Sequence, residues 1–235
     1  MQHLIFIFLV LKMLSYQPYF TIKEKRLTLN SGADLLYTIS TPRRISAKEK
    51  TPLIIALHWG WDMNKPLPPW FGKDFLTGFI QPAFEDINPI ILAPDCPANN
   101  WYNESSEQAV LELMDYIMKE YPVDSGNIYL TGYSAGGFGT WYLSSRYPDL
   151  FTMAIPIACK PEEEWIRNWK DLPVFIIHGT RDELFPYTDI EVLVNEMELK
   201  NVPVKLVKVE NASHYDTGKY ITSLKYSPIW FKEIY

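Results

Sequence analysis

Residues 127–145 read NIYLTGYSAGGFGTWYLSS, and this segment decides the fold. Its first part is a short apolar run typical of a strand, and its second part is typical of a helix. Between them lies GYSAG at residues 132–136, a G-x-S-x-G pattern. A serine between a strand and a helix, with glycines where the chain doubles back, is the arrangement of a nucleophile elbow. We therefore interpret Ser134 as a candidate nucleophile.

Outward from this segment, strands alternate with helices along most of the chain. Continuous apolar runs such as LIIAL and IILAP indicate strands that are buried on both faces. The alternation predicts a mostly parallel sheet with helices on both faces, an α/β fold. The predicted strands are residues 20–29, 34–41, 52–58, 90–94, 127–132, 153–158, 174–178 and 204–209. The predicted helices are 105–121, which begins with a capping box of Ser105 and Gln108, 136–147, 188–200 and 217–234.

Length and composition limit the possibilities further. The chain has 235 residues, of which 47% are apolar, and its net charge is −6. This length suits one domain, which we predict for residues 16–235. The negative charge and the lack of a Lys/Arg-rich run argue against a nucleic-acid partner. Two cysteines exclude a disulfide scaffold and any zinc site built from four cysteines.

Residues 1–15 are expected to form an apolar leader or an N-terminal strand. The run from Leu4 to Leu11 is too short to span a bilayer, so we expect no stable membrane anchor. It has the length of the apolar part of a signal peptide, but no Lys or Arg precedes it and no small-x-small cleavage site follows. Export and a cytoplasmic location both stay open.

A serine nucleophile needs a base, and the base needs an acid to orient it. His214 lies in a polar loop between the last strand and the last helix, whereas His58 and His178 end buried strands and suit structural roles. Asp182 follows the strand that ends VFIIHG, and its rivals are Glu183, Asp189 and Asp216. Parallel strands bring such loops to one edge of the sheet. The chain order Ser134, Asp182, His214 favours these three residues as the catalytic set.

An acyl-transfer site also needs two N–H donors for the oxyanion. One should be Ala135, which follows the nucleophile, and the other should come from the loop after residues 52–58. Aromatic side chains at this edge could stack on a sugar or an aromatic acyl group, or they could only pack the loops. The candidate substrate-binding residues are Trp59, Trp61, Trp101 and Tyr133.

These motifs resemble the α/β-hydrolase superfamily, and in particular its small bacterial esterases and predicted peptidases of the phospholipase/carboxylesterase and dienelactone hydrolase-like group. The similar stretches include LIIALHWG, ILAPDCP, NIYLTGYSAGGFGTWYLSSRYPDLF, VFIIHGTRDELFP and VENASHYD, so they cover most of the chain. The family's His-Gly-x-Gly is His-Trp-Gly-Trp here, at residues 58–61. Alignment on His58 implies Gly60 as the second oxyanion donor, with Trp59 as the alternative.

The resemblance implies an α/β-hydrolase fold and a serine hydrolase of the carboxylesterase type. It implies a Ser134–His214–Asp182 triad that acts through an acyl-enzyme, without a cofactor or metal. The substrate would be a small ester, such as an acylated sugar or an aromatic ester, and the protein a monomer or small homo-oligomer. A serine peptidase or amidase on the same scaffold stays open, as does a non-catalytic binding protein.

Two structural expectations also follow from the resemblance. Residues 160–172 leave room for at most a short helix where larger relatives insert a lid. In the family's strand order, Cys96 and Cys159 follow strands three positions apart, about 14 Å, whereas a disulfide needs Cα atoms within about 7 Å. We therefore expect two free thiols.

Overall fold

One mixed sheet of eight strands organises the computed structural model, which describes residues 20–46, 48–62, 64–167, 169 and 171–234. The strand order is β1-β2-β4-β3-β5-β6-β7-β8. β2 pairs antiparallel with both β1 and β4, and the pairs from β4 to β8 are parallel. The strands are β1 Phe20–Thr28, β2 Asp34–Pro42, β3 Thr51–Leu57, β4 Ile90–Pro94, β5 Val123–Tyr133, β6 Met153–Ile157, β7 Val174–Gly179 and β8 Val204–Val209.

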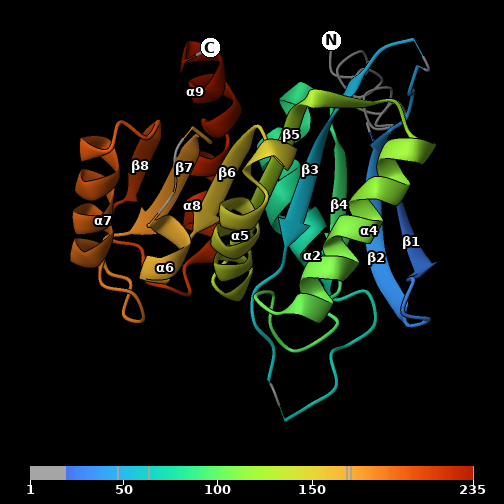
Figure 1. Cartoon of the computed structure of the whole chain (residues 1–235), viewed down its shortest axis with the longest axis horizontal. Coiled ribbons are helices and arrows are strands. Elements are labelled where there is room, and N and C mark those ends of the chain that lie inside the picture. The colour runs from blue at the N-terminus through green and yellow to red at the C-terminus, as the bar shows by residue number, and fades with distance from the viewer. Residues whose placement is uncertain (1–19, 47, 63, 168, 170, 235) are drawn as a thin grey trace, which may run out of the picture.

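Helices cover both faces of this sheet (Figure 1). One buried cluster joins α4, α5 and α7 to one face, and a second joins α2, η1 and α8 to the other. The longer helices are α4 Glu104–Glu120, α5 Ala135–Arg146, α7 Tyr187–Leu199, α8 Thr217–Leu224 and α9 Ser227–Ile234. The short ones are α2 Gly72–Phe75, η1 Leu76–Ile80, α3 Gln81–Phe84, η2 Glu85–Ile87, η3 Pro148–Leu150 and α6 Glu163–Ile166. The predicted α/β-hydrolase architecture is confirmed.

The central strands are the most deeply buried part of the sheet. Every residue of β4, β6 and β7 is buried, as their unbroken apolar runs predicted. The edge strands β1 and β8 are instead largely exposed or half-buried, and their exposed residues include Lys23, Glu24 and Arg26 on β1 and Lys205 and Lys208 on β8. Charged side chains on an edge strand discourage pairing with another chain.

The structure corrects three local predictions. Residues 72–84, for which no element was predicted, form the successive short helices α2, η1 and α3. The predicted final helix 217–234 is two helices, and Pro228, which has no N–H to donate, lies in the first turn of the second. The cap of α4 is Asn103, whose side chain accepts from the N–H of Ser106, and not Ser105.

Other features agree with prediction, and one lies outside the described residues. Among the described residues of the connection after β6, the only helix is the four-residue α6, as the predicted minimal lid requires. Cys96 and Cys159 are both free thiols. The predicted leader, residues 1–15, falls outside the described part of the chain. In that described part, no helix is long and apolar enough to cross a membrane.

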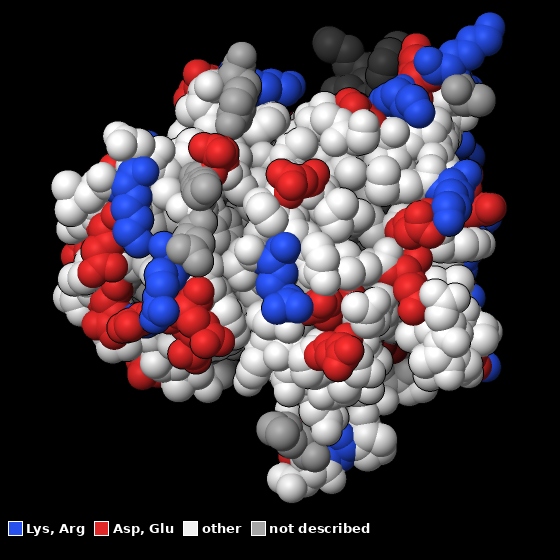
Figure 2. Space-filling model, in the orientation of Figure 1, with Lys and Arg blue, Asp and Glu red and all other residues white. Residues whose placement is uncertain are grey.

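Charged side chains are spread over the surface. Figure 2 shows acidic and basic groups interspersed on the face viewed, where the described residues form no broad basic patch. A field of mixed sign gives little long-range attraction for a polyanion.

The turn from β5 into α5 is the tightest packing in the sheet. A Cβ atom at Gly132 would lie 2.2 Å from the carbonyl oxygen of Gly136. A Cβ at Gly136 would lie 1.9 Å from the carbonyl oxygen of Leu57, on the neighbouring strand β3. Real Cβ contacts are not this short, so both positions require glycine for helix α5 to begin where it does.

We expect Gly136→Ala to destabilise the protein by at least about 3 kcal/mol, because the backbone of β3 or α5 must move to relieve the overlap. The control is Gly78→Ala in η1, where a Cβ meets nothing within 4 Å. Alanine is the better helix former, so this control should be neutral or stabilising by up to about 1 kcal/mol. Urea denaturation of both variants measures the difference. Equal free energies of unfolding would contradict the packing described here.

Candidate active site

Ser134 occupies the turn between β5 and α5 with a strained backbone. Its φ is 53° and its ψ is −115°, outside the regions that residues with a side chain favour. The turn holds because the N–H of Ser134 donates to the carbonyl of Ile157 on β6, at 2.9 Å, and because α5 packs closely on β3. Such strain costs about 1–3 kcal/mol, which the surrounding packing offsets. The turn presents the serine hydroxyl at the N-terminal end of α5.

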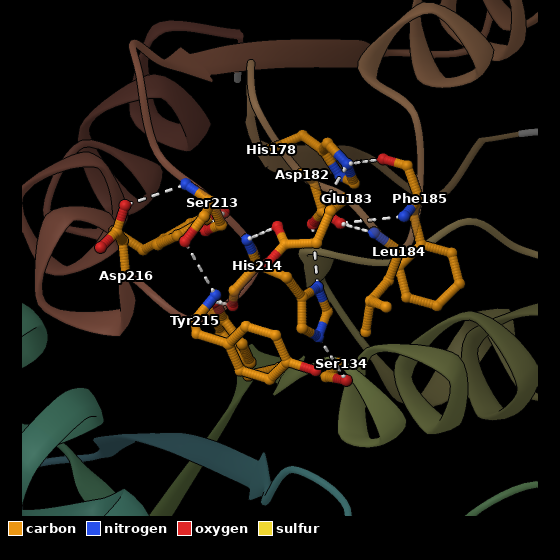
Figure 3. Close-up of polar contacts among 12 residues, drawn as sticks. Ser134, His178, Asp182, Glu183, Leu184, Phe185, Ser213, His214, Tyr215 and Asp216 are labelled. Carbon is orange, nitrogen blue, oxygen red and sulfur yellow. Dashed lines mark hydrogen bonds and ion pairs between the residues drawn. The ribbon is translucent and has the colours of Figure 1, made fainter.

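His214 and Asp182 meet this serine at the carboxyl edge of the sheet (Figure 3). Nε2 of His214 lies 2.9 Å from Oγ of Ser134. Nδ1 of His214 lies 2.9 Å from Oδ2 of Asp182. The histidine is 3% exposed and the aspartate 6% exposed, so solvent competes little with these contacts. The structure thus brings together the three residues that the chain order singled out.

The contacts of Asp182 determine which ring nitrogen of His214 carries the proton. Burial opposes ionisation of the carboxyl, but hydrogen bonds from His214 and from the N–H of Phe185 outweigh it and hold the pKa of Asp182 below its ordinary value. An ionised carboxylate only accepts hydrogen bonds, so Nδ1 of His214 carries a proton. In the neutral ring Nε2 is then free to accept the proton of Ser134.

The rival acids have other partners. Glu183 accepts a hydrogen bond from the backbone N–H of His214, and not from its ring. Asp189 forms an ion pair with Lys160. Asp216 accepts from the N–H of Ser213. Of these four carboxylates, only that of Asp182 bonds to the ring of His214.

The other strand-end histidines have the structural contacts that the sequence suggested. His178 is fully buried and its Nε2 lies 2.8 Å from the carbonyl oxygen of Phe185. Burial lowers the pKa of His58 to about 4, so its ring is neutral at pH 7. Nε2 of His58 accepts from the N–H of Cys96 at 3.1 Å, and its Nδ1 lies 2.6 Å from the carbonyl oxygen of Trp59. His3 lies outside the described residues.

The contact between His58 and Trp59 also bears on the predicted oxyanion donors. In a trans peptide the carbonyl of Trp59 and the N–H of Gly60 point in opposite directions, so this N–H points away from His58. A Cβ placed on Gly60 would lie 3.6 Å from that of Ala135. Ala135 is the first residue of α5, whose leading N–H groups have no acceptor within the helix. Gly60 and Ala135 are thus neighbours, and their donor roles remain a prediction.

Two of the four aromatic residues predicted to bind substrate are buried. Trp101 is 1% exposed and its Nε1 donates to the carbonyl of His58. Tyr133 is 2% exposed and its hydroxyl donates to the carbonyl of His214. Both rings are almost wholly enclosed by protein, and Trp101 lines a small cavity beside Gly60 and Ala135. Trp59 is half-buried and Trp61 is 41% exposed, so for these two the prediction stands untested.

Two aromatic residues near His214 were missed in the sequence. Phe185 lies with its ring centroid 5.6 Å from that of His214, and Phe138 lies 5.4 Å from Phe185. Both line an open cavity of about 660 Å3 together with residues 160–164 and Arg167. Phe138 is four residues after Ser134 on α5, so the helical spacing could have placed it near the nucleophile. No local signal marked Phe185.

No group of three or more His, Cys, Asp or Glu residues able to hold a metal occurs among the residues described. The site contains a serine, a histidine and an aspartate in hydrogen-bonded series, beside the N-terminal end of α5. This series can transfer a proton away from the serine hydroxyl as it attacks.

Comparison with known proteins agrees with this geometry. Residues 99–217, just over half of the chain, match the dienelactone hydrolase family. They include all three residues of the series. The chain belongs to the dienelactone hydrolase family. The superfamily suggested by its sequence motifs is confirmed.

The relatives of this dienelactone hydrolase family member include proteins named as esterases. A stretch of 113 residues is 27% identical to feruloyl esterase B of Thermothelomyces thermophilus and covers 43% of this chain and 36% of that protein. A stretch of 84 residues is 29% identical to a bifunctional acetylxylan esterase/xylanase of Neocallimastix patriciarum, covering 36% of this chain and 12% of that protein. The matches thus span well under half the length of these relatives.

Solved structures share the fold of this dienelactone hydrolase family member. A thermostable esterase superposes with a TM-score of 0.74 at 24% identity, covering 90% of this chain and 62% of that one. A ferulic acid esterase superposes with a TM-score of 0.71 at 16% identity, covering 92% of this chain and 99% of that one. At these identities the likeness concerns the fold.

We expect Ser134→Gly to be more stable than Ser134→Ala by about 1–2 kcal/mol. Glycine adopts a positive φ without steric cost, whereas alanine keeps the Cβ that strains this turn. Both variants lack the hydroxyl, so the comparison isolates the backbone. Thermal unfolding of the two variants measures it. If alanine were as stable as glycine, the turn would not be strained.

Proposed function

We propose that this protein is a serine hydrolase that cleaves carboxylic esters through an acyl-enzyme on Ser134. The observation that supports this most strongly is the series from Ser134 Oγ to His214 Nε2 and from His214 Nδ1 to Asp182 Oδ2, with 2.9 Å at each contact. Family membership and the names of the relatives agree with the proposal.

In the first half of the reaction, Ser134 Oγ attacks the ester carbonyl carbon and its proton passes to Nε2 of His214. The carbonyl oxygen becomes an oxyanion, which the N–H groups of Ala135 and Gly60 would stabilise. Asp182 stabilises the imidazolium that has formed. Collapse of the tetrahedral intermediate then breaks the bond to the alcohol oxygen, which takes the proton from His214 and leaves.

The second half repeats this sequence with water. His214 accepts a proton from the water as its oxygen attacks the acyl carbon. A second oxyanion forms and collapses, the bond to Ser134 Oγ breaks, and the serine regains its proton from His214. The products are a carboxylic acid and the free enzyme. Each step uses residues of this chain and one water molecule, and no oxidant or reductant is needed.

The substrate is proposed to be a small ester with an acylated sugar or an aromatic acyl group. The short α6 leaves the site open, and the cavity lined by Phe138 and Phe185 is large enough for a group of that size. Named relatives include a feruloyl esterase and an acetylxylan esterase. We also keep the prediction that the protein is a monomer or a small homo-oligomer. Its location, cytoplasmic or exported, stays open as in the sequence analysis.

The nearest alternative is a serine peptidase or amidase, because the same triad cleaves both bonds. Relative rates on p-nitrophenyl acetate and p-nitroacetanilide, which share an acyl group, separate the two functions. A non-catalytic binding protein is the more distant alternative. It would neither turn over these substrates nor react with a fluorophosphonate.

We expect a fluorophosphonate probe to label the native protein, and Ser134→Ala to abolish both labelling and hydrolysis of p-nitrophenyl acetate. Asp182→Asn should lower kcat by about 10⁴-fold, because the histidine loses its preferred tautomer and the charge that stabilises its protonated form. Asp189→Asn, a matched change at an exposed ion pair, should alter kcat less than twofold.

Two results would contradict the proposal. Labelling of Ser134→Ala at the native rate would mean that another residue is the nucleophile. Native protein that neither labels nor hydrolyses any ester would favour the binding protein.

A further inference from the structure

The backbone of His214 is held at both its polar groups by side chains. Its N–H donates to Oε2 of Glu183 at 2.8 Å (Figure 3). Its carbonyl accepts from the hydroxyl of Tyr133. Burial raises the pKa of Tyr133 well above its ordinary value, so this hydroxyl keeps its proton and remains a donor. These bonds come in addition to the two that the imidazole ring makes.

The two tethering residues are chain neighbours of the other members of the triad. Tyr133 directly precedes Ser134, and Glu183 directly follows Asp182. His214 therefore receives one pair of contacts from residues 133–134 and another from residues 182–183. In each pair, one residue contacts the imidazole ring of His214 and its chain neighbour contacts the backbone of His214. A movement of either segment would carry the ring contact and the backbone contact together.

The loop that carries His214 has separate anchors of its own. Its neighbour Ser213 donates its N–H to Asp216 at 2.9 Å and accepts at its carbonyl from Tyr220 at 3.0 Å. Asp216 caps α8 and Tyr220 lies within it. The loop is thus fastened to α8 through Ser213, and the ring of Tyr220 in turn packs edge to face on that of Tyr133, with 5.3 Å between the centroids. The side chains of Tyr133 and Glu183 instead fix His214 relative to the nucleophile and the acid.

We propose that Tyr133 and Glu183 are positioning residues that hold the backbone of His214 in register with Ser134 and Asp182. The proposal rests on the hydrolase function proposed above. Proton transfer requires the ring nitrogen within about 0.5 Å of its productive place, and a shift of about 1 Å can cost about 100-fold in rate. Tyr133 is 2% exposed and the carboxylate of Glu183 is engaged by the backbone N–H of His214, so we expect the effect to fall on kcat.

The main test compares Tyr133→Phe with Tyr129→Phe. Both substitutions remove one oxygen atom from a buried tyrosine of β5. The hydroxyl of Tyr129, however, donates to Asn127 and not to the loop that carries His214. We expect Tyr133→Phe to lower kcat by about 10-fold or more with KM changed less than twofold, and to slow fluorophosphonate labelling in parallel. Tyr129→Phe should change neither.

Glu183 provides a second, independent test if Tyr133→Phe fails to fold. Glu183→Ala removes the acceptor, whereas Glu183→Gln keeps an amide oxygen that can accept from the same N–H. We expect Glu183→Ala to lower kcat about three- to tenfold and Glu183→Gln to restore most of it. Hydrogen exchange at the amide of His214 should accelerate in Glu183→Ala and not in Glu183→Gln.

The outcomes separate this inference from the hydrolase function. Active wild-type protein with equal kcat in Tyr133→Phe and Tyr129→Phe would overturn the role of Tyr133. Unchanged kcat and unchanged exchange in Glu183→Ala would overturn that of Glu183, as would a rise in KM alone. Wild-type protein without labelling or hydrolysis would refute the function instead, and the amide exchange would still report on the Glu183 tether.

Discussion

The structure depends on the close approach of α5 to strands β3 and β6, directly after a strained turn. Glycines allow this approach: a Cβ at Gly136 would overlap the backbone of Leu57, and one at Gly137 would lie 2.3 Å from Sγ of Cys159. The same contact brings the loop after β3 beside Ala135 and lets Ile157 bond the N–H of Ser134. One packing constraint therefore places Ser134, the N–H groups beside it and the start of α5.

The rest of the site is assembled around this fixed point by topology. β7 and β8 extend the parallel sheet beyond β6, so their carboxyl ends open on the same edge as that of β5. Asp182 and His214 follow those two strands and meet above the turn. Asp182 and His214 are buried and Ser134 is half-buried, which strengthens the hydrogen bonds between them, because water competes poorly in a region of low dielectric constant.

Much of this arrangement could be predicted from local patterns. The unbroken apolar runs of β3, β4 and β7 predicted buried parallel strands. The sequence GYSAG between a strand and a helix predicted the turn. Once parallel order was assumed, the polar residues after each strand had to share one edge, which pointed to Asp182 and His214. The glycines were informative because their requirement is steric and local.

The features that were missed depend on contacts that the sequence does not display. For Trp101 the sequence left open stacking on a substrate or packing of the loops, and it did not show the hydrogen bond from the indole N–H to the carbonyl of His58 that accompanies its burial in the core. Helices α2 to α3 contain Gly78 and Pro82, which weaken a helical prediction although their apolar spacing suits one. The tethers of His214 join residues 81 and 31 positions apart, and no periodic pattern reports such pairs.

The central claim, that the strained turn exposes Ser134 for attack on an ester carbonyl, can be tested by trapping the covalent intermediate. Rapid acid quenching during turnover of a slowly deacylated aryl ester, followed by peptide mass spectrometry, locates the acyl group. The account predicts the added acyl mass on the peptide containing Ser134 and its absence in Ser134→Ala. An acyl group on any other residue, or hydrolysis that proceeds without a covalent adduct, would contradict it.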